Sequence, residues 1–170
     1  MGTLCSPYLT FVGVRTGEKE LVKNFRIRAA NPHDLAKICE IEDVTFSHDP
    51  YPAFLIQRLL NDENSLFYVA TSEEAEIIGY LVSKIEDDSA HLISLAVLPA
   101  QQRLGTATQL LKELTAVLRQ RGIREIRLEV RPDNGGAIKL YSQFRFREES
   151  VIPQYYSDGS PALLMRKVIE

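Results

Sequence analysis

The stretch that decides the fold is LAVLPAQQRLGTATQLL, residues 95–111. An apolar run from His91 to Leu98 ends at Pro99. A short polar segment with Gly105 follows, and apolar residues then recur at helical spacing over residues 104–118. This order predicts a strand, a tight turn and a helix. The first N–H groups of a helix point outward at the positive end of its dipole, so the turn can hold a phosphate without a lysine.

Composition limits the class of protein. The chain has 170 residues, of which 45% are hydrophobic, so it can bury the core of one domain. A net charge of -3 and a pI of about 5.7 argue against non-specific nucleic-acid binding. Its apolar runs are far shorter than the roughly 20 residues that span a bilayer. We expect a soluble, cytoplasmic protein that binds neither nucleic acid nor a membrane directly.

The potential metal ligands are few and scattered. Cys5 and Cys39 are the only cysteines, and they show no C-x-x-C spacing. The three histidines are His33, His48 and His91, which lie far apart in the sequence. We therefore expect neither a disulfide framework nor a metal site.

The first half of the chain divides into an extension and the start of a domain. Residues 1–23 have scattered apolar positions and no assigned role, and the domain is expected to cover residues 24–170. Alternation over residues 25–29 predicts a strand. Asn31 is a suitable N-cap, with Pro32 at the first helical position, for a helix that continues to about Val44. Two prolines make residues 46–52 a loop, and a second helix is predicted over residues 53–60.

The second half alternates strands and helices. Strands are predicted over residues 66–70, 77–85, 123–130 and 162–168, and a further strand begins around residues 144–146. The strand over residues 123–130 follows a helix, so it should lie parallel to the strand that begins at His91. Glu129 lies near its C-terminal end, where open sheets place ligands. Residues 134–141 predict a turn and a short helix.

Four motifs resemble those of one family. They are Q-x-x-G-x-A at residues 102–107, L-E-V-R at 128–131, N-x-x-A-x-x-L-Y at 134–141 and Y-Y-x-D-G at 155–159. The first is similar to the signature of the GCN5-related N-acetyltransferases (GNAT). The other three look like the N-terminal protein acetyltransferases within that superfamily, including the ribosomal-protein-alanine acetyltransferases. The resemblance covers residues 25–167.

The resemblance implies an α/β (α+β) fold with one GNAT domain. Its sheet should be mixed, mostly antiparallel and twisted, with about seven strands and about four helices. A V-shaped splay should separate the fourth and fifth strands. One departure from the family pattern is Arg145, which replaces the usual glycine before a phenylalanine and predicts a different local backbone there.

The resemblance also implies acetyl-coenzyme A (acetyl-CoA) as co-substrate and no metal. Backbone N–H groups of the splayed strand would pair with the pantetheine arm and polarise the thioester carbonyl. The turn before the helix would hold the pyrophosphate. The residues that the resemblance assigns to the cofactor are Leu95, Ala96, Val97, Gln102, Arg103, Leu104, Gly105, Thr106, Ala107, Thr108, Asn134 and Tyr141.

Three residues are candidates for catalysis. By resemblance, Glu129 accepts the amine proton through water, and Tyr141 protonates the departing thiolate. His91 is a second candidate for the base, because it lies on the neighbouring strand. About a tenth of an α-amine is already free base at neutral pH, so the base has modest work. Pattern alone favours a solvent-facing Glu129 and a core position for Tyr141 with its hydroxyl at the surface, and it is the motif context that favours catalysis.

Aromatic residues from two loops are expected to hold the substrate. Tyr155 and Tyr156 lie beside the last turn and could clamp a peptide main chain. Phe46 and Tyr51, from the proline-bracketed loop, would form the opposite wall. The alternative is that Tyr155 and Tyr156 only pack the last hairpin.

We expect transfer of the acetyl group to the α-amino group of a protein or peptide by direct attack in a ternary complex. Ribosomal proteins are candidate substrates, and the enzyme could be a monomer or a homodimer. A second possibility is a small amine or an internal lysine as acceptor. An acidic pocket from Glu40, Glu42, Asp43 and Asp49 would favour the small amine. A third is a non-catalytic subunit that only binds acyl-CoA.

Overall fold

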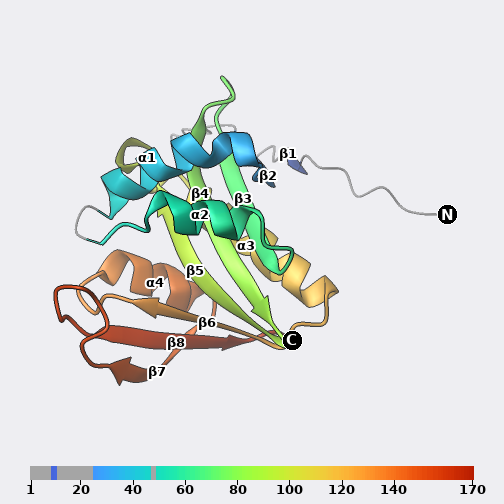
Figure 1. The fold of residues 1–170 in the computed structure, drawn as a ribbon. Helices are drawn as coiled ribbons and strands as arrows, with labels where there is room; N and C mark the ends of the chain where they lie inside the picture. Colours follow the sequence, from blue (N-terminus) through green and yellow to red (C-terminus); the bar gives the residue numbers. More distant parts are fainter. Residues whose placement is uncertain (1–8, 11–24, 47–48) are drawn as a thin grey trace, which may run out of the picture.

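The computed structural model describes residues 9–10, 25–46 and 49–170, and within them one twisted sheet organises the fold (Figure 1). The sheet has eight strands in the order β1-β2-β3-β4-β5-β6-β8-β7. Neighbouring strands are antiparallel except for β5 and β6, which are parallel. The strands are β1 (Leu9–Thr10), β2 (Arg26–Ala29), β3 (Ser65–Thr71), β4 (Ile77–Glu86), β5 (Ser89–Val97), β6 (Glu125–Val130), β7 (Arg147–Ile152) and β8 (Ala162–Val168).

This architecture confirms the predicted mixed, mostly antiparallel sheet. Strands β2 to β8 correspond to the predicted strands. The two-residue β1 lies in the segment that had no assigned role, where Leu9 pairs with Ile27. The rest of residues 1–23 lies outside the described residues, as does His48.

Helices cover both faces of the sheet (Figure 1). The α-helices of the described chain are α1 (Leu35–Thr45), α2 (Ala53–Leu60), α3 (Thr106–Gln120) and α4 (Gly135–Gln143). Side chains of α1 and α2 share one apolar cluster, and side chains of α3 and α4 share the other. None of the helices in the described part of the chain is long and apolar enough to cross a membrane.

Alternation along β3 explains the two clusters. Leu66 and Ala70 pack with the cluster on the α3 side, whereas Phe67 and Val69 pack with the cluster on the α1 side. Successive side chains of a strand point to opposite faces, so one apolar strand can supply both cores. The sheet is therefore the middle layer of three.

The predicted helix start at Asn31 is confirmed in detail. Asn31 Oδ1 accepts a hydrogen bond from His33 N at 2.9 Å, and the Asp34 carboxylate accepts one from Asn31 N at 2.9 Å. Arg28 holds the same carboxylate with two bonds of 2.7 and 2.9 Å. A capping box thus leads through the 3-10 turn Pro32–Asp34 into α1.

The expectation of a different backbone at Arg145 is wrong. Arg145 has a φ of +67°, which is the left-handed conformation that glycine adopts readily. The turn after α4 therefore keeps its left-handed geometry, and the exposed arginine bears the resulting strain.

Candidate active site

Strands β5 and β6 pair only at one end. The parallel ladder joins residues 89–91 to residues 125–127, while β5 continues to Val97 and β6 to Val130. The ladder between β4 and β5 shifts register so that Ile93 has no partner in β4. Such a bulge bends the strand that carries it. Figure 1 shows the resulting fork, which matches the predicted splay.

The predicted cofactor strand lies along one arm of the fork. Leu95, Ala96 and Val97 pair with residues 79–81 of β4, on the side away from β6. Because β5 has left β6 before this point, every second residue directs its backbone N–H and C=O into the fork rather than into a ladder. These groups can bind an extended chain such as the pantetheine arm.

The turn before α3 has the geometry of an anion site. Gly105 has a φ of +89°, and no atom lies within 4 Å of the place that a β-carbon would take. Gln102 Nε2 donates to Val97 O at 3.1 Å, which ties the turn to the end of β5. The hydroxyl of Thr106 is buried and has no partner among the described residues. The open N-terminus of α3 therefore fits the pyrophosphate of acetyl-CoA.

The remaining cofactor residues of the turn are less enclosed. Arg103 is exposed and has a φ of +62°, and Leu104, Ala107 and Thr108 are partly buried around the start of α3. Asn134 is the N-cap of α4, where its Oδ1 accepts a hydrogen bond from Ala137 N at 3.1 Å. In the described structure the Asn134 amide oxygen therefore supports the helix, and its Nδ2 group is the part that can reach a ligand.

Glu129 and His91 meet at the base of the fork. Glu129 Oε2 lies 2.6 Å from His91 Nε2, and the Glu129 side chain is only 10% exposed. Burial raises the pKa of Glu129, but the hydrogen bond and charge of His91, with the charge of Arg127, outweigh it and leave the pKa below its usual value. Glu129 is therefore an ionised, partly enclosed carboxylate and not a solvent-facing one.

Tyr141 lies on the buried face of α4. Its ring packs against the Phe146 ring at a centroid distance of 5.7 Å. Burial, and to a lesser extent Tyr156, raises the pKa of Tyr141. The phenol therefore keeps its proton and remains available as a donor.

The tyrosines from the two predicted walls come together. Tyr155 and Tyr156 contact edge to face, with ring centroids 5.1 Å apart. The pKa of Tyr51 is raised by burial and then by the nearby carboxylates of Glu42 and Glu129, so Tyr51 lies close to both acids. Ser157 N donates to Asp49 Oδ2 at 3.3 Å, which joins the two loops directly.

Phe46 has a different setting. It packs partly buried against the apolar cluster beneath α1 and α2. Tyr51 borders the same cluster, but it also faces the acids described above. The structure thus groups Tyr51, Tyr155 and Tyr156 around Glu129 and places Phe46 in the core that supports Tyr51.

Glu42 also belongs to this neighbourhood, at a position that the sequence pattern did not lead us to predict. Its side chain is almost fully buried, Oε1 accepts from Tyr51 N at 2.9 Å, and Oε2 accepts from the Tyr80 hydroxyl. Tyr80 also bonds Ser94 Oγ at 2.9 Å. Burial raises the pKa of Glu42 to about 7. A carboxylate at helical spacing from Leu35 and Ile38, on the apolar face of α1, was the available signal.

The four acids of the first loop region do not form the acidic pocket that a small-amine acceptor would favour. Glu40 and Asp43 lie on the exposed face of α1, and Glu40 pairs with Lys37 at 2.8 Å. Glu42 points inward, and Asp49 is exposed in the loop. The four acids therefore do not converge on one pocket.

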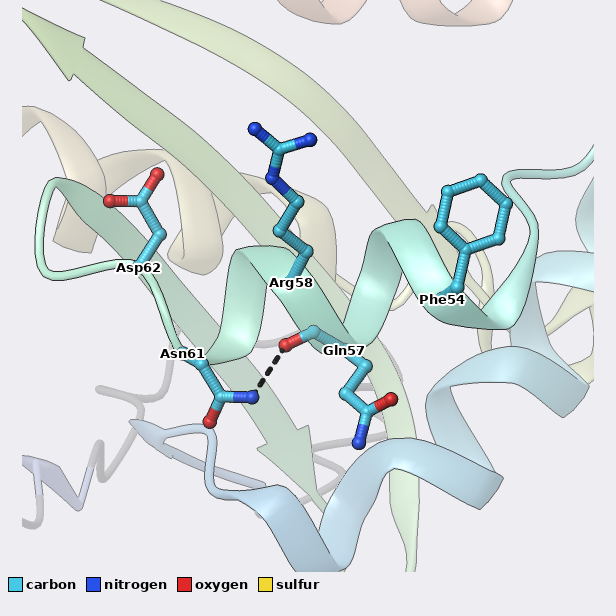
Figure 2. Close-up of a pocket in the computed structure, with 5 residues that line it drawn as sticks. All are labelled: Phe54, Gln57, Arg58, Asn61 and Asp62. Carbon is cyan, nitrogen blue, oxygen red and sulfur yellow. Dashed lines mark hydrogen bonds between the residues drawn. The ribbon is translucent and has the colours of Figure 1, made fainter.

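A shallow pocket elsewhere has none of these groups. It lies on the outer side of α2 and is lined by Phe54, Gln57, Arg58, Asn61 and Asp62 (Figure 2). Asn61 Nδ2 donates to Gln57 O at 3.0 Å, and the sheet lies behind the helix. No predicted site residue lines it, so the fork is the better candidate for the active site.

Comparisons with known proteins show the family to which the chain belongs. Residues 33–146 match the model of the Acetyltransferase (GNAT) family. The chain is 34% identical over 155 residues to the N-alpha-acetyltransferase of Sulfolobus acidocaldarius, covering 84% of this chain and 91% of that protein. The structure of the Escherichia coli ribosomal-protein-S18-alanine N-acetyltransferase superposes with a TM-score of 0.79 at 28% identity, covering 86% of this chain and 94% of that one.

A second solved structure gives the same result. Ard1 from Thermoplasma volcanium superposes with a TM-score of 0.79 at 28% identity, covering 86% of this chain and 98% of that one. The family match includes the β5 arm of the fork, the anion-binding turn and Glu129. With its forked parallel strands and the glycine turn at the start of α3, this chain belongs to the acetyltransferase (GNAT) family.

Proposed function

We propose that the protein transfers the acetyl group of acetyl-CoA to the α-amino group of a protein or peptide. The observation that carries this proposal is the 2.6 Å contact between His91 and Glu129 at the base of the fork, bordered by three tyrosines. An N-terminal amine and the first peptide groups match an enclosed carboxylate flanked by aromatic rings. The similarity to archaeal N-alpha-acetyltransferases supports the same acceptor.

The β5 arm and the α3 turn hold the co-substrate. Acetyl-CoA supplies the activated acetyl thioester. Backbone groups of Leu95, Ala96 and Val97 orient the pantetheine arm, and residues 102–108 hold the pyrophosphate at the positive end of α3. Asn134 lies at the N-terminus of α4 and contacts the cofactor arm through its amide.

Glu129 and His91 act on the attacking amine. The pKa of Glu129 is below its usual value, so the carboxylate is ionised at neutral pH and can accept a proton. Through water, it takes the proton that the amine must lose, and His91 orients the carboxylate and can share that proton. Because part of the α-amine is already neutral, a carboxylate of this basicity is adequate.

Tyr141 supplies the proton for the leaving thiolate. Burial keeps its pKa above the usual value, so the hydroxyl is protonated when the C–S bond breaks. Attack is direct in a ternary complex, which needs no cysteine, and neither Cys5 nor Cys39 falls on a matched motif. Burial, and then the charges of Asp43 and Glu42, also raise the pKa of the Cys39 thiol. Tyr51, Tyr155 and Tyr156 hold the main chain of the substrate, with Phe46 beneath the first loop.

Ribosomal proteins in the cytoplasm are the substrates that we favour within this class. The support is the similarity to the E. coli enzyme, whose substrate is alanine of ribosomal protein S18. Peptides that begin with alanine or serine should therefore be better substrates than peptides that begin with methionine.

The test is release of free CoA with matched peptides. One peptide has a free N-terminus, and the other has a blocked N-terminus and an internal lysine. Turnover that needs the free α-amine supports the proposal. Equal turnover of the blocked peptide would assign the activity to lysine instead, and turnover of small amines alone would contradict a peptide acceptor.

A further inference from the structure

Arg131 connects the catalytic strand to the loop of tyrosines. It follows β6 two residues after Glu129 and is partly buried. Its guanidinium carbon lies 3.9 Å from the centroid of the Tyr156 ring. Its Nη1 donates to Asp158 Oδ2 at 3.0 Å and to Ser160 Oγ at 2.5 Å. One side chain therefore contacts three residues of the loop between β7 and β8.

The loop itself is cross-linked, so these contacts fix more than one residue. Asp158 Oδ1 accepts from Ser160 N at 2.9 Å and from Ser160 Oγ at 2.6 Å. The backbone N–H groups of Tyr155 and Tyr156 both donate to Ser160 O, at 3.0 and 3.1 Å. The edge-to-face contact couples the two rings. Holding Asp158 and Ser160 therefore also holds both tyrosines.

The chemistry of arginine suits this position. A planar guanidinium can lie flat on a ring while its edge donates hydrogen bonds, which an ammonium group cannot do. Arg131 Nη2 is buried and has no hydrogen-bond acceptor among the described residues. A buried donor without an acceptor needs an explanation, and the face of Tyr156 provides one. Hydrogen bonds from Ser160, and then from Arg131, lower the pKa of Asp158 to about 2, so the pair is charged at any working pH.

We propose that Arg131 is a positioning residue that holds Tyr155 and Tyr156 at the substrate end of the fork and so sets the KM for the peptide. This inference rests on the proposed function. Tyr155 and Tyr156 both lie close enough to Glu129 for its charge to raise their pKa values, after the larger effect of burial. Because Arg131 directly follows the strand that carries Glu129, it fixes the loop relative to the base. Its loss should weaken peptide binding and leave the cofactor site intact.

The first experiment compares Arg131→Met and Arg131→Lys with wild type. Arg131→Met should raise the KM for a free N-terminal peptide about tenfold, with kcat and the KM for acetyl-CoA within about threefold of wild type. Arg131→Lys keeps the charge, but the lysine cannot lie flat on Tyr156. Its peptide KM should therefore lie between that of wild type and that of Arg131→Met. The control is Arg166→Gln, because Arg166 also pairs with carboxylates, Glu125 and Glu149, but on β8. It should leave the peptide KM unchanged.

A double-mutant cycle tests whether Arg131 acts on the peptide KM through Tyr156. In a Tyr156→Leu background, Arg131→Met should raise the peptide KM by a smaller factor than it does in the wild-type background, because one of the two rings that Arg131 holds is already absent. Full additivity would contradict the proposal. A fall in kcat, or a rise in the KM for acetyl-CoA, as large as the change in peptide KM would also contradict it.

A second readout does not depend on turnover. Chymotrypsin cleavage after Tyr155 and Tyr156, followed by mass spectrometry, should be faster in Arg131→Met than in wild type and in Arg166→Gln. If wild type acetylates no peptide, the proposed function fails, while this cleavage still tests whether Arg131 holds the loop. Equal cleavage rates in all three proteins would overturn the proposal.

If Arg131→Met does not fold, a variant that removes the hydrogen-bond partners of Arg131 still tests the proposal. The double variant Asp158→Asn with Ser160→Ala weakens both hydrogen bonds while the guanidinium remains. It should also raise the peptide KM and speed cleavage of the loop. An unchanged peptide KM in this variant would overturn the proposal.

Discussion

Glu129 Oε2 and His91 Nε2 lie 2.6 Å apart, although the two residues are 38 positions apart in the sequence. The contact exists because His91 pairs with Arg127 in the short parallel ladder, and Glu129, two residues further along β6, lies on the same face of the sheet as Arg127. Beyond this point the strands diverge. The pair therefore stands where the fork opens, and the proposed mechanism depends on it.

Glu129→Gln should lower kcat about a hundredfold or more at neutral pH, because the amide cannot accept the amine proton. The loss should shrink as pH rises from about 6.5 to 9, since more of the α-amine is then neutral without help. The measurement is the pH dependence of kcat with one peptide. Glu125→Gln, on the same strand but paired with Arg166 at 3.2 Å, is the matched control. A loss that is independent of pH would argue against a role as base.

Glu42 should make stability depend on pH. Burial raises its pKa from 4.5 to about 7 in the folded protein. Between these values the native state binds a proton that the unfolded state has lost, so the free energy of unfolding falls as pH rises from about 4.5 to 7. Glu42→Gln should flatten this slope, as measured by urea unfolding across the range. Glu40→Gln, on the exposed face of α1, should keep it, and an unchanged slope in Glu42→Gln would contradict the assignment.

Gly79→Ala should disturb the cofactor arm. A β-carbon at Gly79 would lie 2.8 Å from Ala96 O and 3.1 Å from Val97 Cγ2, so β5 must move. We expect a loss of about 1–3 kcal/mol in the free energy of unfolding. The KM for acetyl-CoA should rise more than the KM for the peptide. Steady-state kinetics with each substrate varied would check this. An unchanged KM for acetyl-CoA would show that Ala96 and Val97 do not belong to the cofactor site.

Position 145 should accept glycine with less loss of stability than a β-branched residue. A left-handed backbone costs a non-glycine residue about 1–2 kcal/mol, and glycine removes that strain at the expense of a more flexible unfolded chain. Arg145→Gly should therefore be at least as stable as wild type, whereas Arg145→Val should be less stable by about 1–2 kcal/mol. Thermal and urea unfolding measure both. Equal stability of the two variants would contradict the observed φ of +67°.

Local signals in the sequence were sufficient for most of the fold. Asn31 and Pro32 mark the helix start because their side chains act within one turn, and Pro99 with Gly105 marks the strand–turn–helix for the same reason. The element boundaries then follow from apolar spacing. The motif resemblance correctly added the splay, whose physical basis is the bulge at Ile93.

Contacts between residues far apart in the sequence could not be predicted from local sequence patterns. The hydrogen bond between Asp49 and Ser157 joins two loops that are 108 residues apart in the sequence. Glu42 turned inward because Tyr51 N and the Tyr80 hydroxyl satisfy its oxygens there, and those partners are known only once the helix is packed. Arg145 kept a glycine-like backbone because the turn after α4 overrides the preference of one residue.

The most direct measurement is the position of the acetyl group after one turnover. A peptide with both a free N-terminal alanine and an internal lysine would be incubated with acetyl-CoA and excess enzyme, and tandem mass spectrometry would locate the acetyl group. The proposed function predicts acetyl on the α-amine alone, with the yield sharply reduced in Glu129→Gln. Acetyl on the lysine, or equal yield from the variant, would contradict it.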